Sequence, residues 1–224
     1  MKQNTTGVFL NRYPYSDTSL IAVFYTKQGL KKFMFKGGKK KSHALYPLSF
    51  CELTFYQRND SAMANLTAVE PALRTSFQMQ PVKSTVAFFM AEVFQKCVHE
   101  DAEDPHMFEF MKQQVEYLDS ASEVWRPLEF IIRLTEQLGI QPLVENPSGS
   151  FNVEEGVVDV GLKGKCYQGE SVELITSLIL GDPVMASGST RRESLEIMLE
   201  YYRLHLPNFG AISSYEIVRE ILYS

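Results

Sequence analysis

The sequence predicts an α+β fold in which a small five-stranded barrel in residues 1–80 precedes a helical C-terminal domain in residues 81–224. Two patterns predict it. Short segments of alternating apolar and polar residues fill about the first 70 positions, and after Pro81 apolar residues recur at three- and four-residue spacing. A chain of 224 residues with 45% hydrophobic residues can bury one large core or two modest ones.

The expected strands are short and rich in β-branched and aromatic residues, with turn signals between them. They are Gly7–Tyr13, Ser19–Tyr25, Leu30–Phe35, Ser49–Tyr56 and Met63–Val69. An open sheet would leave its edge strands unpaired, so closure into a barrel is expected. A five-stranded Greek-key barrel of this size is the OB-fold, a common oligonucleotide-binding scaffold.

Amphipathic periodicity predicts the helices, since Val86, Phe89, Val93 and Cys97 fall on one helical face. The first expected helix follows Pro81 and includes residues 86–97, and the others span about 105–118, 125–138, 195–206 and 217–222. A Ser or Thr three residues before a Glu suggests capping boxes for three of them, in the pairs Ser120–Glu123, Thr190–Glu193 and Ser213–Glu216. Residues 146–169 are rich in Gly, Ser and Val, which predicts a small irregular or β insertion.

Charge is divided unevenly along the chain. Residues 1–80 contain 11 basic and 4 acidic residues, a net charge of +7, whereas residues 81–224 contain 11 and 23, a net charge of −12. This polarity predicts a polyanion-binding face on the barrel, with nucleic acid as the first candidate. An anionic membrane surface ranks last, because no basic amphipathic helix accompanies the lysines.

The basic residues concentrate between Asp17 and Glu52, where no acid occurs. Strand alternation places Lys31 and Lys32 on opposite faces, so neither face of that strand is purely basic. The densest group is the turn Lys36–Lys41, whose two glycines permit close approach of a phosphate backbone. Lysine is a flexible point charge, so this turn should bind DNA with little sequence preference. The DNA contacts expected from charge are Lys27, Lys31, Lys32, Lys36, Lys39, Lys40 and Lys41, and Gly37 is added because its backbone can approach a phosphate closely.

Aromatic residues in the same part of the chain could stack on unpaired bases or fill the barrel core. They are Tyr13, Tyr15, Phe24, Phe33, Phe35 and Tyr46. The pattern leaves both interpretations open.

Motifs of catalysis are missing, so we expect a protein that is not an enzyme and uses no cofactor. Gly37-Gly38-Lys39 is no phosphate loop, because the Gly-Lys-Ser/Thr ending of that motif is absent. His99 and His106 bracket an acidic run whose spacing fits no metal site. An enzyme with dispersed catalytic groups remains an alternative.

Cysteine usage and hydropathy predict the compartment. Cys51, Cys97 and Cys166 are odd in number and far apart, which argues against a disulfide framework. Signal-peptide and membrane-spanning patterns are missing as well. A cytoplasmic protein without a membrane partner is expected.

Several segments occur in the order found in a known family. Asn11–Leu20, Phe24–Thr26, Lys36–Lys39 and Leu45–Leu48 together resemble the opening of the bacterial recombination mediator RecO family. The segment from Leu128 to Gly139 is similar to a helix of the same family, and Tyr202–Leu222 to its terminal helices.

The resemblance implies an OB-fold followed by a helical domain, with no nucleotide hydrolysis. Family members bind single- and double-stranded DNA and anneal complementary strands. Together with RecR they help RecA displace the single-stranded-DNA-binding protein SSB. The resemblance adds Arg12 to the lysine turn as a DNA contact and implies a bacterial, nucleoid-associated location. An RNA-binding OB-fold module is the alternative.

The resemblance also implies a groove for the acidic C-terminal tail of SSB in the helical domain. It maps onto Arg126, Phe130 and Arg133. On pattern alone, the two arginines flank an apolar stripe, where each could pair with a carboxylate of a partner or of a neighbouring helix.

Two departures from the family pattern stand out. Many relatives carry four zinc-binding cysteines in the segment that corresponds to residues 142–171, where this chain has only Cys166. A basic segment near the family's C-terminus is replaced by Gly210–Tyr215. We therefore expect a zinc-free variant whose DNA contacts concentrate in the barrel.

Overall fold

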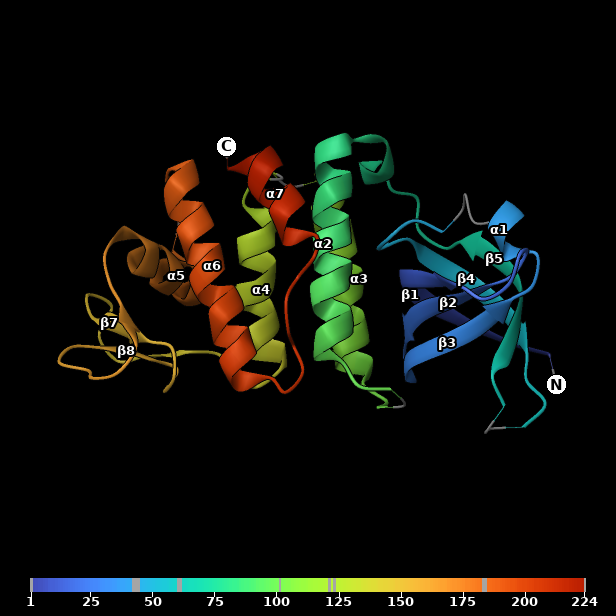
Figure 1. The fold of residues 1–224 in the computed structure, drawn as a ribbon, viewed down its shortest axis with the longest axis horizontal. Helices are drawn as coiled ribbons and strands as arrows, with labels where there is room; N and C mark the ends of the chain where they lie inside the picture. Colours follow the sequence, from blue (N-terminus) through green and yellow to red (C-terminus); the bar gives the residue numbers. More distant parts are fainter. Residues whose placement is uncertain are drawn as a thin grey trace. The chain divides into compact units, whose positions relative to one another are not determined.

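The computed structural model describes residues 2–41, 45–59, 62–100, 102–120, 122, 124–182 and 185–223, apart from the side chain of Lys41. It divides into two compact units, Met1–Ala121 and Ser122–Ser224. Each unit has its own arrangement of elements and is described by itself (Figure 1).

The first unit contains the expected five-stranded barrel. Its strands are β1 (Lys2–Pro14), β2 (Leu20–Thr26), β3 (Gly29–Phe35), β4 (Phe50–Tyr56) and β5 (Ala64–Pro71). They close in the order β1-β2-β3-β5-β4, and all neighbours are antiparallel except β3 and β5. This topology confirms the predicted OB-fold.

Closure depends on the length of β1, which begins earlier than the sequence predicts. Its first half pairs with β4 and its second half with β2. The register of its pairing with β2 shifts between Phe9 and Asn11 of β1. Such an irregularity bends a strand so that it can serve both neighbours. Gly7 pairs with both strands, and a Cβ there would lie 3.2 Å from Phe24 and from Leu53, which explains its small size.

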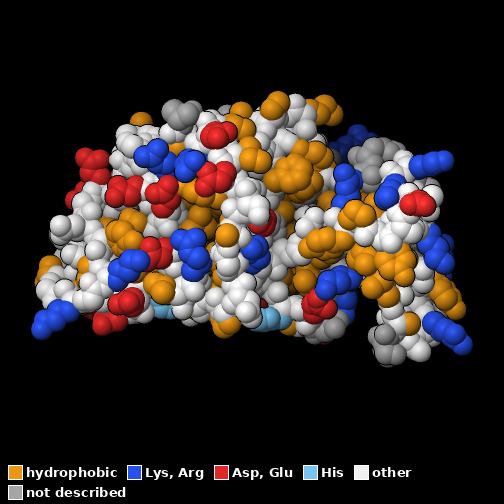
Figure 2. All heavy atoms as spheres, viewed as in Figure 1, with side chains coloured by type: hydrophobic (Ala, Val, Ile, Leu, Met, Phe, Trp, Pro, Cys, Tyr) orange, Lys and Arg blue, Asp and Glu red, His pale blue; other side chains and the backbone are white. Residues whose placement is uncertain are grey.

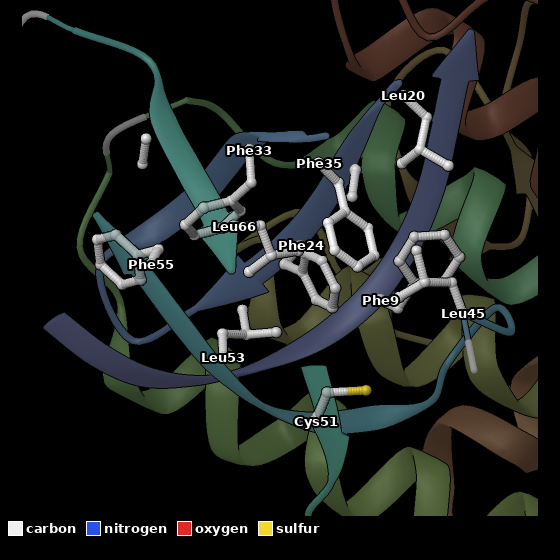
Figure 3. Packing of buried hydrophobic residues seen from close by; sticks show 12 residues of the cluster. Phe9, Leu20, Phe24, Phe33, Phe35, Leu45, Cys51, Leu53, Phe55 and Leu66 are labelled. Atoms are coloured by element: carbon white, nitrogen blue, oxygen red, sulfur yellow. The ribbon is translucent and has the colours of Figure 1, made fainter. Parts of the chain in front are cut away.

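The barrel interior is filled by aromatic and aliphatic side chains that point toward one another (Figure 3). Phe24 contacts Phe9 edge-on at a centroid distance of 5.3 Å, and Phe33 contacts Phe24 and Phe55 at 5.9 and 5.1 Å. Burial of these rings and of the leucines between them stabilises the barrel through the hydrophobic effect.

Helices complete the first unit. The short α1 (Gly38–Lys41) follows β3, the three-residue 3-10 helix η2 (Phe77–Met79) follows β5, and α2 (Pro81–Cys97) and α3 (Pro105–Ser120) lie side by side. Both long helices pack on the barrel, through ring contacts of Tyr25 with Phe94 and of Phe50 with Phe108.

Strands give way to helices at Pro81 as predicted, whereas the compact unit continues to Ala121. The domain boundary at residue 80 stays a prediction.

The second unit consists of helices around a small sheet. The helices are α4 (Arg126–Gln137), α5 (Glu170–Leu180), α6 (Gly188–His205) and α7 (Tyr215–Leu222). The strands β6 (Leu143–Val144), β7 (Ser150–Asn152), β8 (Val157–Asp159) and β9 (Cys166–Tyr167) form a sheet in the order β6-β8-β7-β9. Residues 146–169 therefore form most of a small sheet.

Tyrosine hydroxyls on α6 tie this unit together. The Tyr202 hydroxyl donates to the carbonyl of Ile131 and the Tyr201 hydroxyl to that of Ile140, each at 2.6 Å. Ile131 lies in the middle of α4 and Ile140 three residues after its end, so the two bonds join α6 to α4 and to the segment that follows it. None of the described helices is long and apolar enough to cross a bilayer.

The three predicted capping boxes are wrong. Ser120 ends α3, where its hydroxyl bonds back to the carbonyl of Glu116, and Glu123 lies outside the described residues. Ser187 caps α6 instead of Thr190, accepting a bond from the Thr190 amide at 3.1 Å. The N-cap of α7 is Ser214, one residue later than predicted. Helix α5 was not predicted at all.

Candidate nucleic-acid interface

The hairpin of β2 and β3 separates the expected DNA contacts into two groups. Leu20 pairs with Phe35 at one end of the hairpin, and Thr26 pairs with Gly29 at the other. At about 3.3 Å per residue, these ends lie about 20 Å apart along β3. Lys36–Lys41 follow the first end, whereas Lys27 sits in the turn at the second.

The segment Lys36–Lys41, called here the lysine turn, is fixed to a neighbouring loop. The Lys39 amide donates to the carbonyl of Thr18 at 3.2 Å, and the Lys40 amide donates to the carbonyl of Gly37 at 3.3 Å. Gly37 has a φ of 67°, a left-handed conformation that favours glycine. The side chains of Lys36, Lys39 and Lys40 are exposed, so the turn presents ammonium groups from a held backbone. The side chain of Lys41 lies outside the described residues.

Arg12 belongs to the same end of the barrel. It is exposed on β1 opposite Ala22, two residues before the strand ends at Pro14. The β1–β2 loop that follows contains Thr18, which anchors the lysine turn, and one acid, Asp17. Figure 2 shows basic side chains gathered over the barrel strands, with few acidic side chains among them on the face in view. Arg12 and the lysine turn therefore form one basic end.

The second group of lysines has partners within its own unit. The Lys27 ammonium lies 5.8 Å from the centroid of the Phe108 ring. Lys32 forms an ion pair with Glu100. Lys31 is half-buried on the same strand face as the core residues Phe33 and Phe35. These contacts reduce the charge that Lys27 and Lys32 offer to DNA.

The six aromatic candidates divide clearly by burial. Phe24, Phe33 and Phe35 are core residues. Tyr46 contacts Phe88 of α2 with centroids 5.6 Å apart, and burial raises the pKa of its hydroxyl. Tyr13 and Tyr15 are 43% and 63% exposed. Only these two of the six present their rings as platforms for a base.

Two hollows lie along the barrel. One of about 640 Å³ is lined by ends of β1, β3 and β4 and includes Lys31. The other, of about 540 Å³, lies between β3 and the C-terminal end of α2, and Tyr13 lines it. Lys32 and Glu100 line both hollows, so their ion pair lies between them.

The predicted contacts for an acidic tail do not all reach the surface. Arg126 is fully buried at the start of α4, with Nη1 2.9 Å from Oε2 of Glu129. Phe130 is fully buried as well. Arg133, in the middle of α4, is exposed. Of the three residues, the structure presents only Arg133 to a partner in this conformation.

The single cysteine of the small sheet has a local role. Cys166 is half-buried in β9, with its thiol 3.7 Å from the carbonyl of Lys163. Among the residues that the structure describes, no three side chains of His, Cys, Asp or Glu are grouped as metal ligands.

Sequence reasoning did not identify the contacts that organise this interface. The Thr18 anchor is a backbone bond, which leaves no sequence signal. Glu100 is 68 residues from Lys32 and belongs to the acidic part of the chain. The hydrogen bond from Gln95 to the Tyr13 hydroxyl likewise joins residues 82 positions apart.

Comparison with known proteins matches both parts of the chain. The family model described as "Recombination protein O N terminal" matches residues 1–73, and "Recombination protein O C terminal" matches residues 78–211. A DNA repair protein RecO from Phocaeicola vulgatus is 28% identical over 240 residues, covering 99% of both chains. A protein of the same name from Bacteroides fragilis is 27% identical, and the match covers 99% of this chain and 99% of the relative. Another from Christiangramia forsetii is 25% identical, and the match covers 97% of this chain and 98% of the relative.

Proposed function

The chain belongs to the recombination protein O (RecO) family, and we propose that it is a DNA-binding mediator of repair and recombination that is not an enzyme. The observation that carries the proposal is the basic end of the barrel. There Arg12 lies on β1 two residues before the β1–β2 loop, and the lysine turn follows β3 with its backbone anchored at Thr18 of that loop. The names of the relatives support the same role.

The chemistry of this end suits the sugar-phosphate backbone. Ammonium groups neutralise phosphates without reading base edges, so binding should depend little on sequence. If two strands are held this way, their mutual repulsion falls and complementary bases can pair. We infer that the protein anneals complementary strands of single-stranded DNA, and that it also binds duplex DNA through the same residues.

The wider role follows from the family. We infer that the protein acts with RecR and assists RecA loading on DNA coated with SSB, in the bacterial cytoplasm. An acidic SSB tail would contact the second unit, where exposed Arg133 on α4 supports an electrostatic contact. An annealing assay on SSB-coated complementary strands, with and without RecR, tests this role. Annealing that SSB blocks completely, even with RecR present, would contradict it.

The DNA site is tested by the salt dependence of single-stranded DNA binding. About five neutralised phosphates give a slope of log affinity against log salt near −3.5. Replacing Lys36, Lys39 and Lys40 by Gln should make the slope shallower by about 2. Replacing Lys163, Arg192 and Arg203 by Gln removes the same charge from exposed positions of the second unit and serves as the control. Equal effects of both triple variants would refute the assignment to the lysine turn.

Competition between DNA and RNA of equal sequence separates this proposal from an RNA-binding module. A protein that contacts the 2′-hydroxyl would prefer RNA. We expect no preference for RNA, because lysines that contact phosphate do not distinguish the two sugars.

A further inference from the structure

Tyr13 is an exposed aromatic residue whose orientation is held from two sides. Its hydroxyl accepts hydrogen bonds from Nδ2 of Asn11 at 3.2 Å and from Nε2 of Gln95 at 3.1 Å. Asn11 belongs to β1 and Gln95 to α2, so the barrel and a helix of the same unit position the ring together. The ring nevertheless remains 43% exposed. A rigid, accessible aromatic face is the feature that base stacking requires.

The ring lies on the outer face of the barrel, beside a hollow. Tyr13 pairs with Ile21, and Ile21 pairs with Met34, so these three side chains share the face opposite the core. The hollow of about 540 Å³ is lined by Tyr13, Ile21, Leu30 and Val98, and its polar groups are Gln95, His99 and the ion pair of Lys32 with Glu100. Its volume lies within the roughly 300–1,000 Å³ typical of small-ligand sites. The polar groups could hydrogen-bond the edge of a planar ring.

The lysine turn follows the row of the sheet that contains Tyr13. Met34 lies in that row two strands, about 10 Å, from Tyr13, and Lys36 follows Met34 by two residues, about 7 Å along the strand direction. Arg12 is the neighbour of Tyr13 in sequence. A strand whose phosphates contact the lysine turn would therefore bring a nearby base to the Tyr13 ring.

We propose that one unpaired nucleobase of single-stranded DNA stacks on Tyr13 in this hollow while the adjoining phosphates contact the lysine turn. The inference rests on the proposed DNA-binding function and adds a base site to it. Tyr15 is more exposed, but it lies in the β1–β2 loop and does not line the hollow. Stacking tolerates any base, so the site keeps binding independent of sequence and favours single strands over duplex.

The test compares two oligonucleotides that have the same number of phosphates. One is an oligothymidylate with a single internal 2-aminopurine, and the other is an abasic strand of equal length. Tyr13→Ala should bind the first about tenfold more weakly, as expected for the loss of one stacked base, with an unchanged salt slope. Its affinity for the abasic strand should equal that of the wild type. Quenching of 2-aminopurine fluorescence on binding should also be lost.

Two further variants make the result decisive. Tyr13→Phe keeps the ring and should retain most of the affinity and the quenching. Tyr117→Ala removes a tyrosine of the same unit that is 45% exposed on α3, and should have no effect. Equal binding of 2-aminopurine DNA by Tyr13→Ala and the wild type would overturn the base site. Equal weakening with both oligonucleotides would overturn it too, because Tyr13 would then only support the fold. If the wild type bound neither strand, the proposed function itself would fail.

Discussion

Glu100, just beyond the C-terminal end of α2, forms an ion pair with Lys32 of β3, although the two side chains remain 56% and 40% exposed. A backbone bridge between Glu100 and Leu30 holds the two segments together. Exposed ion pairs contribute little stability, about 0–1 kcal/mol. The carboxylate therefore neutralises Lys32 without being essential to the fold, and a DNA phosphate can compete for the same ammonium group.

Replacing Glu100 by Gln should strengthen binding of single-stranded DNA. Release of Lys32 to contact one more phosphate steepens the salt slope by about 0.7. The measurement is fluorescence anisotropy over a series of salt concentrations. Glu103→Gln removes an equal charge from an exposed residue nearby and is the control. If both variants raise affinity equally, the gain reflects net charge, and Lys32 is not a competing site.

Comparing the predicted apolar residues with the residues that the structure buries shows which parts of the fold the sequence predicts. Alternation in β2, β3 and β4 places large apolar residues on one face, and the structure buries those residues in the barrel. Helix α5 escaped prediction because its run from Leu174 to Leu180 is equally compatible with a buried strand. Two local signals were nevertheless present, since Glu170 lies in the first turn and Gly181 ends the helix in the left-handed conformation.

The candidate site was predictable in composition but not in geometry. The density of lysine at Lys36–Lys41 identified the exposed turn. The sequence could not show that Lys27, in the turn of the hairpin, and Lys32, in the middle of β3, have partners, because Phe108 and Glu100 are distant in the chain. Arg126 illustrates the same limit, since periodicity placed it at the margin of an apolar stripe, yet it is fully buried.

Asp119 should stabilise the segment between the barrel and α2. One carboxylate oxygen accepts bonds from the amides of Ser76 and Phe77 at 2.7 and 2.8 Å. Burial alone would raise the pKa of Asp119, but these bonds outweigh it and the pKa is lowered. Asp119→Ala should cost about 1 kcal/mol at pH 7, as the loss of a helix cap does, and should speed hydrogen exchange of both amides about fivefold.

The pH dependence of that effect has a defined sign. A carboxyl group with a lowered pKa stabilises the folded state above its unfolded pKa of about 3.9, and this stability is lost as pH falls through the folded pKa. The difference between wild type and Asp119→Ala should therefore shrink below about pH 4. Glu116→Ala, on an exposed position of the same helix, should behave like the wild type. A difference that persists at pH 2 would contradict the role of the ionised carboxylate.

The three cysteines should differ in reactivity. Burial raises the pKa of Cys51 to about 12 and also raises that of Cys97, so both thiols remain protonated at pH 8 and inaccessible. Cys166 is only half-buried. An aromatic disulfide reagent should label one thiol quickly in the native protein and three in urea. Cys166→Ser should abolish the fast phase, and rapid labelling that survives this substitution would show that the barrel or α2 opens readily.

Phe24 should be the most sensitive position in the barrel core. It is fully buried and makes ring contacts with Phe9 and Phe33. Phe24→Ala should lower the free energy of unfolding of this unit by about 3–5 kcal/mol, since it leaves a cavity among rings that cannot collapse. Urea unfolding followed by circular dichroism measures the change. Phe24→Leu should cost less, and equal costs for the two substitutions would show that the cavity is not the cause.

The two glycines of the lysine turn should differ in their effect on DNA binding. A Cβ on Gly38 would lie 2.8 Å from the Phe35 ring and 2.9 Å from Cγ of Leu20, so Gly38→Ala must displace the start of α1 from the barrel. At Gly37 a Cβ meets no atom within 4 Å, and the cost is only that of the positive φ, about 1–2 kcal/mol. Gly38→Ala should therefore weaken single-stranded DNA binding and make its salt slope shallower, whereas Gly37→Ala should have the smaller effect on both at a temperature where the protein stays folded. If Gly38→Ala binds DNA as the wild type does, the position of the turn against Leu20 and Phe35 does not determine how its lysines contact phosphate.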